Sequence, residues 1–276
     1  MRVALIQHDI VWEEPAANHR RLAPRIAAAA EGGAKLVVLS EMFASGFSMA
    51  TDRIAEDADG PTVEFLREQA ARHAVHVCGS VALRNADADA DAGASASGSG
   101  SAGRPGNDLV LAAPDGDIRR YRKIHPFSYA GEDSHYEAGD RVVTWDVAGV
   151  RITPFVCYDL RFAEVFWAAG PGTDAYVVVA NWPASRHPHW RALVVARAIE
   201  NQSYVIAVNR VGEGGGLAYA GGSCVIDPLG EVAADAGADE TIVFADVEPA
   251  RVAEVRAELP FLADRCATPG PVDRPD

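Results

Sequence analysis

Short apolar runs rich in β-branched residues alternate with helical patterns along this chain, and this alternation constrains its fold more than any other feature. The first block has strand-like runs at 3–7, 35–39 and 75–83, with helical patterns at 18–31 and 63–73. A second block has strand-like runs at 150–156, 175–180 and 204–209, with helical patterns that begin near Ala163 and His189. Such alternation is typical of an α/β protein whose helices cover a largely buried sheet.

Two glycine-containing turns add antiparallel strands to this plan. Asp115 and Gly116 lie between the runs 109–113 and 118–121, and Gly149 lies between two further apolar runs. Glycine in a short connection between strand-like runs favours a β-hairpin. We therefore predict a mixed sheet.

One segment, residues 85–106 (NADADADAGASASGSGSAGRPG), contains no aromatic or β-branched residue and offers nothing to a core. It is either a surface loop inserted between two strands or a linker between domains. The flanking runs look like neighbouring strands of one sheet, so we interpret it as a loop. We therefore expect a single domain over residues 1–260, interrupted by this insertion, and an irregular tail over 261–276.

The charge of the chain limits its partners. With 25 basic and 39 acidic residues its formal net charge is −14, whereas nucleic-acid binding needs a basic stripe along the phosphate backbone. No apolar run approaches the roughly 20 residues of a membrane helix, and the start MRVALIQHDI does not resemble a signal peptide. We therefore expect a cytoplasmic protein that binds a small molecule and neither nucleic acid nor membrane.

The cysteines and histidines do not indicate a disulfide framework or a metal site. The four cysteines are widely spaced and form no CxxC pair. His8, His125 and the histidines of the HPH sequence at 187–189 have no carboxylate or cysteine partner at a ligand spacing. We expect reduced thiols, histidines that lie on the surface or in loops, and no metal.

Three chemically reactive residues lie at the ends of apolar runs. Glu41 follows KLVVLS, Lys123 follows RRYR, and Cys157 follows VRITPFV. Each alone has an ordinary explanation, as a solvated loop glutamate, a surface lysine or a thiol that fills the core. A catalytic cysteine, however, needs a base or a positive neighbour, and the oxyanion that it creates needs donors. Glu41 and Lys123 are candidates for these two roles.

The flanks of these three residues together resemble the three motifs of the nitrilase superfamily of carbon–nitrogen hydrolases, whose catalytic triad is Glu-Lys-Cys. The motifs are LSEMFASGF, YRKIHPF and VCYDLRF, and the likeness continues through ANWPASRHPHW, ARAIENQSYVIAVNRVG and YAGGSCVIDPLGE. EMFASGF, GEDSHYEAGD and NWPASR are most similar to the omega-amidase branch, which hydrolyses the terminal amide of 2-oxoglutaramate. The resemblance implies a four-layer α-β-β-α sandwich and a homodimer without cofactor or metal.

By this resemblance, Cys157 would form a thioester with the acyl group of an amide. Glu41 would take the thiol proton, pass it to the departing ammonia and then activate water. Lys123 and the backbone N–H of Tyr158 would stabilise the oxyanion. A second glutamate would orient Lys123 and the substrate amide; Glu132 is our choice for it, and Glu137 is the alternative.

Other residues are candidates for the substrate pocket. Asn181 and Trp182 follow the apolar run 175–180, which indicates either a capped turn or, by the resemblance, a wall against the substrate. Phe43 and Tyr158 are candidates for the walls around a short carbon chain. Arg186 is the candidate to bind a substrate carboxylate, because its planar guanidinium matches that group.

Several polar residues keep structural alternatives. Arg161 is a second candidate for the substrate carboxylate, with a structural salt bridge as its equal alternative. The family pattern suggests that the polar residues of the helical run WRALVVARAIENQ are buried structural residues near a dimer contact: Arg197, Glu200 and Asn201.

The sequence thus favours an amidase that acts on a small 2-oxo acid ω-amide. One alternative is another amidase of the superfamily, acting on an N-carbamoyl compound or an aliphatic amide. The other is a catalytically silent binding protein of the same fold.

Overall fold

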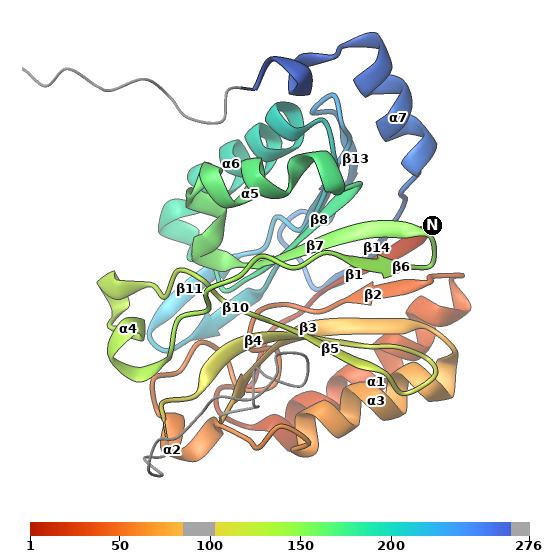
Figure 1. Ribbon diagram of the computed structural model, residues 1–276. Coiled ribbons are helices and arrows are strands. Elements are labelled where there is room, and N and C mark those ends of the chain that lie inside the picture. Colours follow the sequence, from red (N-terminus) through yellow and green to blue (C-terminus); the bar gives the residue numbers. More distant parts are fainter. Residues whose placement is uncertain (85–102, 266–276) are drawn as a thin grey trace, which may run out of the picture.

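The computed structural model describes residues 1–84 and 103–265. Two six-stranded sheets pack face to face, and helices cover the outer face of each sheet, so the layers run α-β-β-α (Figure 1). This is the predicted α/β sandwich with mixed sheets. No helix in the described ranges is long and apolar enough to cross a membrane.

The first sheet carries the N-terminal block. Its strand order is β14 (Thr241–Asp246), β1 (Arg2–Gln7), β2 (Leu36–Val38), β3 (His76–Leu83), β4 (Gly106–Ala112) and β5 (Ile118–Arg122). The three strands β1, β2 and β3 are parallel, and the other neighbours are antiparallel. Helices α1 (Pro15–Glu31) and α3 (Pro61–His73) cover its outer face, and the short α2 spans Thr51–Ile54 (Figure 1).

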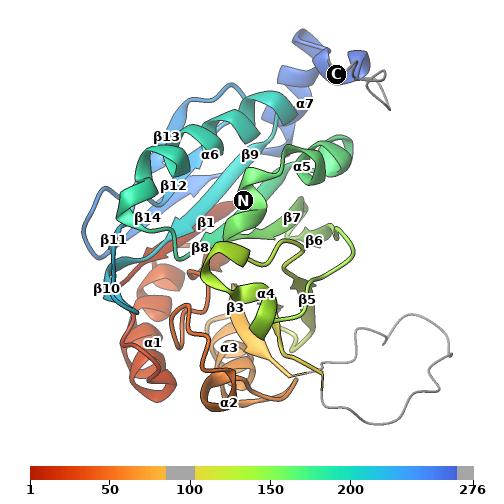
Figure 2. The same cartoon turned by 90° about the vertical axis from the view of Figure 1, so that its left-hand side faces the viewer.

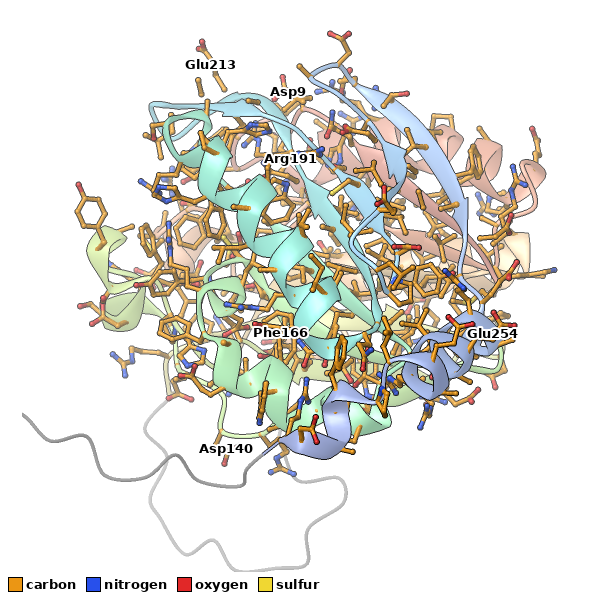
Figure 3. All side chains as sticks on the ribbon, turned by 90° about the horizontal axis from the view of Figure 1, so that it is seen from above. Asp9, Asp140, Phe166, Arg191, Glu213 and Glu254 are labelled. Atoms are coloured by element: carbon orange, nitrogen blue, oxygen red, sulfur yellow. The ribbon has the colours of Figure 1, made fainter. Side chains whose placement is uncertain are left out.

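The second sheet has the order β13 (Val232–Asp235), β12 (Cys224–Ile226), β9 (Tyr204–Asn209), β8 (Ala175–Ala180), β7 (Val150–Val156) and β6 (Trp145–Val147). Strands β7, β8 and β9 are parallel. Helices α5 (Ala163–Ala169) and α6 (His187–Asn201) lie side by side on its outer face, and Phe166 of α5 is labelled in Figure 3. Strands β10 (Val211–Gly214) and β11 (Leu217–Ala220) form a separate hairpin.

The remaining elements are short. They are the helices α4 (Glu132–His135) and α7 (Pro249–Glu258) and five 3₁₀ turns: η1 (Ser128–Ala130), η2 (Cys157–Arg161), η3 (Gly170–Gly172), η4 (Ala184–Arg186) and η5 (Phe261–Asp264).

The alternation of side chains along the first sheet explains why the sheet is apolar on both faces. In β1, Val3 and Leu5 belong to the core between the sheets, whereas Ala4 and Ile6 belong to the core beneath α1 and α3. Successive side chains of a strand point to opposite faces, so a sheet covered on both sides reads as a continuous apolar run. The runs found in the sequence are therefore strands of buried sheets.

The insertion and the tail fall partly outside the described residues. Residues 85–102 and 266–276 lie there, so the predictions for them stay predictions. The predicted insertion extends too far at its end, because Gly106 is the first residue of β4 and pairs with Leu83. A Cβ at Gly106 would lie 2.2 Å from Arg122 Nε, which explains a glycine inside this strand. The tail, expected to be irregular from 261, begins with the turn η5.

Candidate active site

Four polar residues lie at the carboxyl ends of strands from both sheets. Lys123, Cys157 and Asn181 directly follow β5, β7 and β8, and Glu41 follows β2 after two further residues. The pairing pattern points β2 and β5 the same way in the first sheet, as it does β7 and β8 in the second. Figure 2 looks onto this end of the molecule, where α4 lies in front. The carboxyl ends of parallel strands are where ligands bind in α/β proteins.

Three buried charges meet at this end. The ammonium of Lys123 lies 3.0 Å from Glu41 Oε1, and it lies 3.0 and 2.8 Å from the two carboxylate oxygens of Glu132. All three side chains are at most 1% exposed. The structure thus brings together Glu41, Lys123 and Glu132, which the sequence predicts to act together.

The carboxylates set the charge of the lysine. Burial lowers the pKa of Lys123, but the negative charges of Glu132 and Glu41 outweigh it and raise the pKa above its usual value. Burial raises the pKa of Glu132; the charge of Lys123 opposes this and that of Glu41 adds to it. A buried lysine between two carboxylates keeps its proton, whereas an isolated one tends to lose it.

Two asparagines hold the carboxylates in place. Asn107, on β4, donates through Nδ2 to Glu41 Oε1 at 2.9 Å and to Glu132 Oε1 at 3.1 Å. Asn181 donates from its backbone N–H to Glu41 Oε2 at 2.8 Å and from Nδ2 to the backbone carbonyl of Glu41 at 2.6 Å. The Glu41 carboxylate therefore accepts hydrogen bonds from Lys123, Asn107 and Asn181, and these three donors fix its orientation.

Cys157 lies on a tight turn at the end of β7. Its φ is +45°, a left-handed conformation that is uncommon for a residue other than glycine. Desolvation raises the pKa of the Cys157 thiol well above its usual value, and the charge of Glu41 raises it further, against the charge of Lys123, which lowers it. The resting sulfur is therefore a thiol, and a base must remove its proton before it can attack a carbonyl.

A pocket opens beside Cys157. Its lining consists of aromatic and apolar side chains with a few polar ones: Phe47, Phe127, Ala130, Cys157, Tyr158, Arg161, Asn181, Trp182, Pro183, Arg186, Leu217 and Tyr219. A mostly apolar pocket with a small number of placed polar groups is typical of a small-molecule site. Tyr158, Asn181, Trp182 and Arg186, predicted from the sequence, all line it.

Phe43 is the exception among the predicted pocket residues. It is fully buried in the core beneath α1 and α3, where its ring lies 6.5 Å from that of Phe65. Phe47 lines the pocket in its place. Between them the chain turns at Gly46, which has a φ of +76° and donates to the carbonyl of Met42 at 2.7 Å. The turn directs the two phenylalanines to different environments.

Both candidate arginines lie at the pocket without a carboxylate partner in the described part of the chain. The guanidinium of Arg186 lies 5.2 Å from the centre of the Phe127 ring, and that of Arg161 lies 4.9 Å from the Trp182 ring. Arg161 also contacts His189 Nδ1 at 3.0 Å. The structural salt bridge considered for Arg161 is not formed within the described residues.

Other predicted residues occupy structural positions. Glu137 lies 3.6 Å from Arg122 at the surface and does not contact Lys123. Arg197 is buried and donates to the carbonyl of Leu160 at 3.1 and 2.8 Å. Asn201 is also buried and bonds the Arg197 carbonyl, whereas Glu200 is half-exposed. These contacts support the structural interpretation of the α6 polar residues.

The histidines are expected on the surface or in loops, and the structure places His8 and His125 in irregular segments outside the helices and strands. His8 is 2% exposed, and burial lowers its pKa to about 4. His125 lies 2.8 Å from a carboxylate oxygen of Asp159, a partner that its sequence spacing did not indicate. Within residues 1–84 and 103–265, no group of three or more histidine, cysteine, aspartate or glutamate side chains is placed to hold a metal ion.

Two residues of the site carry no clear signal in the sequence. Asn107 lies in β4, but the apolar run that predicts this strand begins only at residue 109, so the sequence does not show that Asn107 belongs to a strand. Asp159 is fully buried although it follows the nucleophile in a polar stretch that reads as a surface turn.

The fold and these residues define an α/β hydrolytic enzyme with a thiol that lines a pocket and a buried cluster of carboxylates and an ammonium close to that thiol. The carbon–nitrogen hydrolase family model matches residues 2–257, so the chain belongs to the carbon–nitrogen hydrolase family, the nitrilase superfamily. It is an amidase of that superfamily.

Individual relatives agree over nearly the whole length. An omega-amidase, YafV of Escherichia coli K12, is 38% identical over 271 residues, which cover 96% of each chain. A 2-oxoglutaramate amidase of Bacillus subtilis is 32% identical and covers 95% of this chain and 96% of its own. A CN-hydrolase superfamily protein of Xanthomonas campestris, solved with an arsenic adduct in its active site, is 39% identical with a TM-score of 0.86, covering 97% of this chain and 98% of its own.

Proposed function

We propose that this amidase hydrolyses the terminal amide of a small 2-oxo acid, such as 2-oxoglutaramate, through a thioester on Cys157. The observation that carries the proposal is the arrangement at the pocket, where Cys157 lies in the field of the Glu41–Lys123–Glu132 cluster while two arginines without carboxylate partners in the described chain lie close by. The names of two relatives, omega-amidase and 2-oxoglutaramate amidase, support the choice of substrate.

The first half of the reaction forms the thioester. Glu41 takes the proton of the Cys157 thiol, and the sulfur attacks the amide carbonyl carbon. The ammonium of Lys123 and the backbone N–H of Tyr158 stabilise the oxyanion of the tetrahedral intermediate. Glu41 then passes its proton to the amide nitrogen, the C–N bond breaks, and ammonia leaves. Because an amide is a poor electrophile, stabilisation of the oxyanion is the largest contribution, and one donor is worth about 10²–10³ in rate.

The second half releases the acid. Glu41, again a carboxylate, takes a proton from a water molecule, and the oxygen attacks the thioester carbon. The same two donors stabilise the second oxyanion. When this intermediate collapses, the C–S bond breaks and Glu41 returns the proton to sulfur. Thiol, base and oxyanion donors are all supplied by the chain, so we propose that the reaction needs no metal or cofactor.

Glu132 serves as the second carboxylate beside the lysine. A lysine ammonium has three N–H bonds. We propose that one of them is donated to Glu41 and a second is shared between the two oxygens of Glu132, which leaves the third for the oxyanion. Glu132 is in turn held by Asn107 and by the backbone N–H of Phe127. We propose that it keeps Lys123 charged and aimed at the reacting carbonyl.

The rest of the pocket suits a short substrate with a carboxylate at the far end. Arg186 binds that carboxylate, and Arg161 adds positive charge, which offsets the net charge of −14 of the chain. Asn181 Oδ1 has no hydrogen-bond partner within the described residues, so it is free to accept an N–H of the substrate amide. Tyr158, Trp182 and Phe127 enclose the carbon chain.

The same proposal includes the organisation of the protein. The sheets share one apolar core, which supports a single domain over residues 1–260. Trp167 on α5 and Ile199 on α6 are 42% and 51% exposed, which supports a homodimer formed through this face. The free thiols of Cys78, Cys157 and Cys224 support a cytoplasmic location.

The test is ammonia release from four amides or ureas at equal concentration. We expect the highest kcat/KM for 2-oxoglutaramate, above glutamine, an N-carbamoyl amino acid and a simple aliphatic amide. Preference for one of the last two compounds would instead indicate another superfamily amidase. No ammonia from any amide would indicate a silent binding protein.

The arginine is tested separately. Because a hydrogen bond to a charged group contributes about 1.5–3 kcal/mol, Arg186→Gln raises KM for 2-oxoglutaramate roughly 10- to 100-fold. The matched control is Arg191→Gln, which removes a guanidinium from the same helix region; Arg191, labelled in Figure 3, pairs with Asp235 at 2.8 Å. An equal KM for the two variants would rule out Arg186 as the carboxylate site.

A further inference from the structure

The catalytic groups proposed above lie on different sheets. Lys123 follows β5 of the first sheet and Cys157 follows β7 of the second. Hydrogen bonds between neighbouring strands fix distances within a sheet but not between two sheets that pack face to face. Interactions other than strand pairing must therefore fix the position of the Cys157 thiol relative to the Lys123 ammonium.

One buried carboxylate connects the two strand ends. Asp159, which is fully buried, accepts through Oδ2 from the backbone N–H of Val156 at 3.0 Å and from the hydroxyl of Tyr121 at 2.8 Å. Its Oδ1 accepts from the backbone N–H of His125 at 2.9 Å and lies 2.8 Å from His125 Nδ1, which must donate because a carboxylate only accepts. Oδ2 therefore joins the end of β5 to the end of β7, and Oδ1 adds two bonds to His125, beyond the end of β5.

These partners flank both catalytic positions. Tyr121 and His125 lie two residues before and two residues after Lys123. Val156 directly precedes Cys157, and Asp159 itself lies two residues beyond it. The carboxylate thus holds the chain on either side of Lys123 to the turn that carries Cys157.

The turn needs such support. A left-handed φ at a residue with a side chain costs roughly 1–2 kcal/mol, so it persists only where the surroundings hold it. At Cys157 the bond from the Val156 N–H to Asp159 closes the turn. On its far side, the His125 ring stacks on Phe162 with centroids 3.8 Å apart.

The hydroxyl of Tyr121 acts as a donor in this network. Burial raises the pKa of Tyr121 well above its usual value, and the negative charge of Asp159 raises it further. The phenol therefore keeps its proton and donates a hydrogen bond to the carboxylate. Four donors then converge on Asp159. The two oxygens of a carboxylate can accept all four hydrogen bonds, whereas an amide side chain has one oxygen and two N–H bonds of its own and cannot.

We propose that Asp159 is a positioning residue that fixes the Cys157 turn against the end of β5, so that the thiol and Lys123 meet the same carbonyl. The inference rests on the proposed function of Cys157 and Lys123. The hydrogen bonds of Asp159 within the described residues go to Tyr121, His125 and Val156 and not to Cys157, Lys123 or Glu41, so it acts through the residues beside the reacting groups.

The experiment compares two variants of the network with two matched controls. Asp159→Asn replaces the carboxylate, and Tyr121→Phe removes one donor. The control for the first is Asp174→Asn, another buried carboxylate that accepts from a backbone N–H and an arginine, at the opposite end of β8. The control for the second is Tyr176→Phe, whose buried hydroxyl bonds the Phe166 carbonyl. Each variant is assayed for kcat, KM and the rate at which iodoacetamide alkylates Cys157.

We expect Asp159→Asn to lower kcat about 10²-fold with KM nearly unchanged, because a displacement of about 1 Å costs that much in rate. Tyr121→Phe lowers kcat by a smaller factor, and both variants slow alkylation of Cys157 relative to their controls. If the folded Asp159→Asn protein matches Asp174→Asn in kcat and alkylation, the proposal is wrong. If Asp159→Asn does not fold, Tyr121→Phe decides, and equality with Tyr176→Phe overturns the proposal.

Alkylation requires no turnover, so it separates this inference from the proposed function. Retained ammonia release by Cys157→Ala would refute the thioester mechanism. Loss of ammonia release in Cys157→Ala, together with an unaffected Asp159→Asn, would refute only the positioning role.

Discussion

At the scale of single residues, the site depends on Lys123, whose ammonium forms ion pairs with two buried carboxylates, Glu41 and Glu132. Removing one partner of a buried ion pair leaves an uncompensated charge, which is far more costly than losing a pair at the surface. Glu132 and Glu137, the two sequence candidates for the second glutamate, differ in just this respect. The first contacts Lys123 at 2.8 Å, and the second contacts Arg122 at 3.6 Å with 37% of its side chain exposed.

Glu132→Gln should therefore lower kcat by roughly 10²–10³, the usual effect of losing an oxyanion donor, since Lys123 loses the partner that orients it. Steady-state ammonia release measures the effect. Glu137→Gln is the matched control and should keep kcat within a factor of about three, because exposed ion pairs contribute little. If both variants have the same kcat, Glu132 has no special role.

Candidate site residues can be found from the sequence when a chemically reactive side chain directly follows a strand-like run. Glu41, Lys123 and Cys157 each lie where an apolar run ends, so the three could be found, and Arg186 follows from the substrate that the resemblance implies. The sequence places Phe43 at the pocket where the structure has Phe47, because the intervening turn at Gly46 is not visible in a pattern of apolar residues. The sequence does not indicate the role of Asp159, because its donors come from residues up to 38 positions away.

At the scale of elements, the positions of the strands and helices follow the sequence patterns closely. The pairing of the strands into sheets does not follow from those patterns. The run predicted at 150–156 is β7 with the same bounds, and the hairpin at Asp115 and Gly116 joins β4 and β5. Which strands share a sheet depends on packing between distant segments, and β-propensity carries little information on that. The division into two sheets therefore came from the family resemblance and not from the pattern.

The strand β3 packs against the segment that carries Glu41, and at Gly79 this packing leaves no room for a side chain. A Cβ at this position would lie 2.6 Å from Phe43 Cδ1 and 3.0 Å from Leu39 Cβ, two residues on either side of Glu41. Overpacking of this kind costs about 1–3 kcal/mol. We expect Gly79→Ala to lower the free energy of unfolding by that amount and to reduce kcat as Glu41 is displaced.

Urea unfolding and ammonia release measure the two effects of Gly79→Ala. The matched control is Gly172→Ala, because nothing lies within 4 Å of a Cβ there and no left-handed φ is required. Gly79→Ala with the stability and kcat of the control would show that β3 does not constrain the Glu41 segment.

At the scale of the whole molecule, the two sheets and their shared core determine the folding stability. Buried titratable groups make that stability depend on pH. Burial lowers the pKa of His8 from 6.5 to about 4. Between these values the unfolded chain binds a proton that the folded chain does not. Folding stability is therefore fully present above pH 6.5 and is lost as the pH falls toward 4, by up to about 3 kcal/mol from this residue.

The prediction is tested by urea unfolding of wild type and His8→Gln at several pH values between 7.5 and 5. The wild type should lose more stability over this range than His8→Gln does, since His19, whose pKa is lowered in the same direction, remains in both. His135→Gln, a change at an exposed histidine, should retain the wild-type pH dependence. A pH dependence unaltered by His8→Gln would mean that His8 is protonated in the folded protein.

The proposed mechanism depends on a covalent intermediate in which Cys157 carries the acyl group of a 2-oxo acid amide. Its most direct test is acid quenching during turnover of 2-oxoglutaramate, followed by mass spectrometry of the protein and its peptides. We expect an adduct on the Cys157 peptide with the mass of the substrate less ammonia, and neither adduct nor ammonia from a folded Cys157→Ala protein. Ammonia release by Cys157→Ala at the wild-type rate would contradict it.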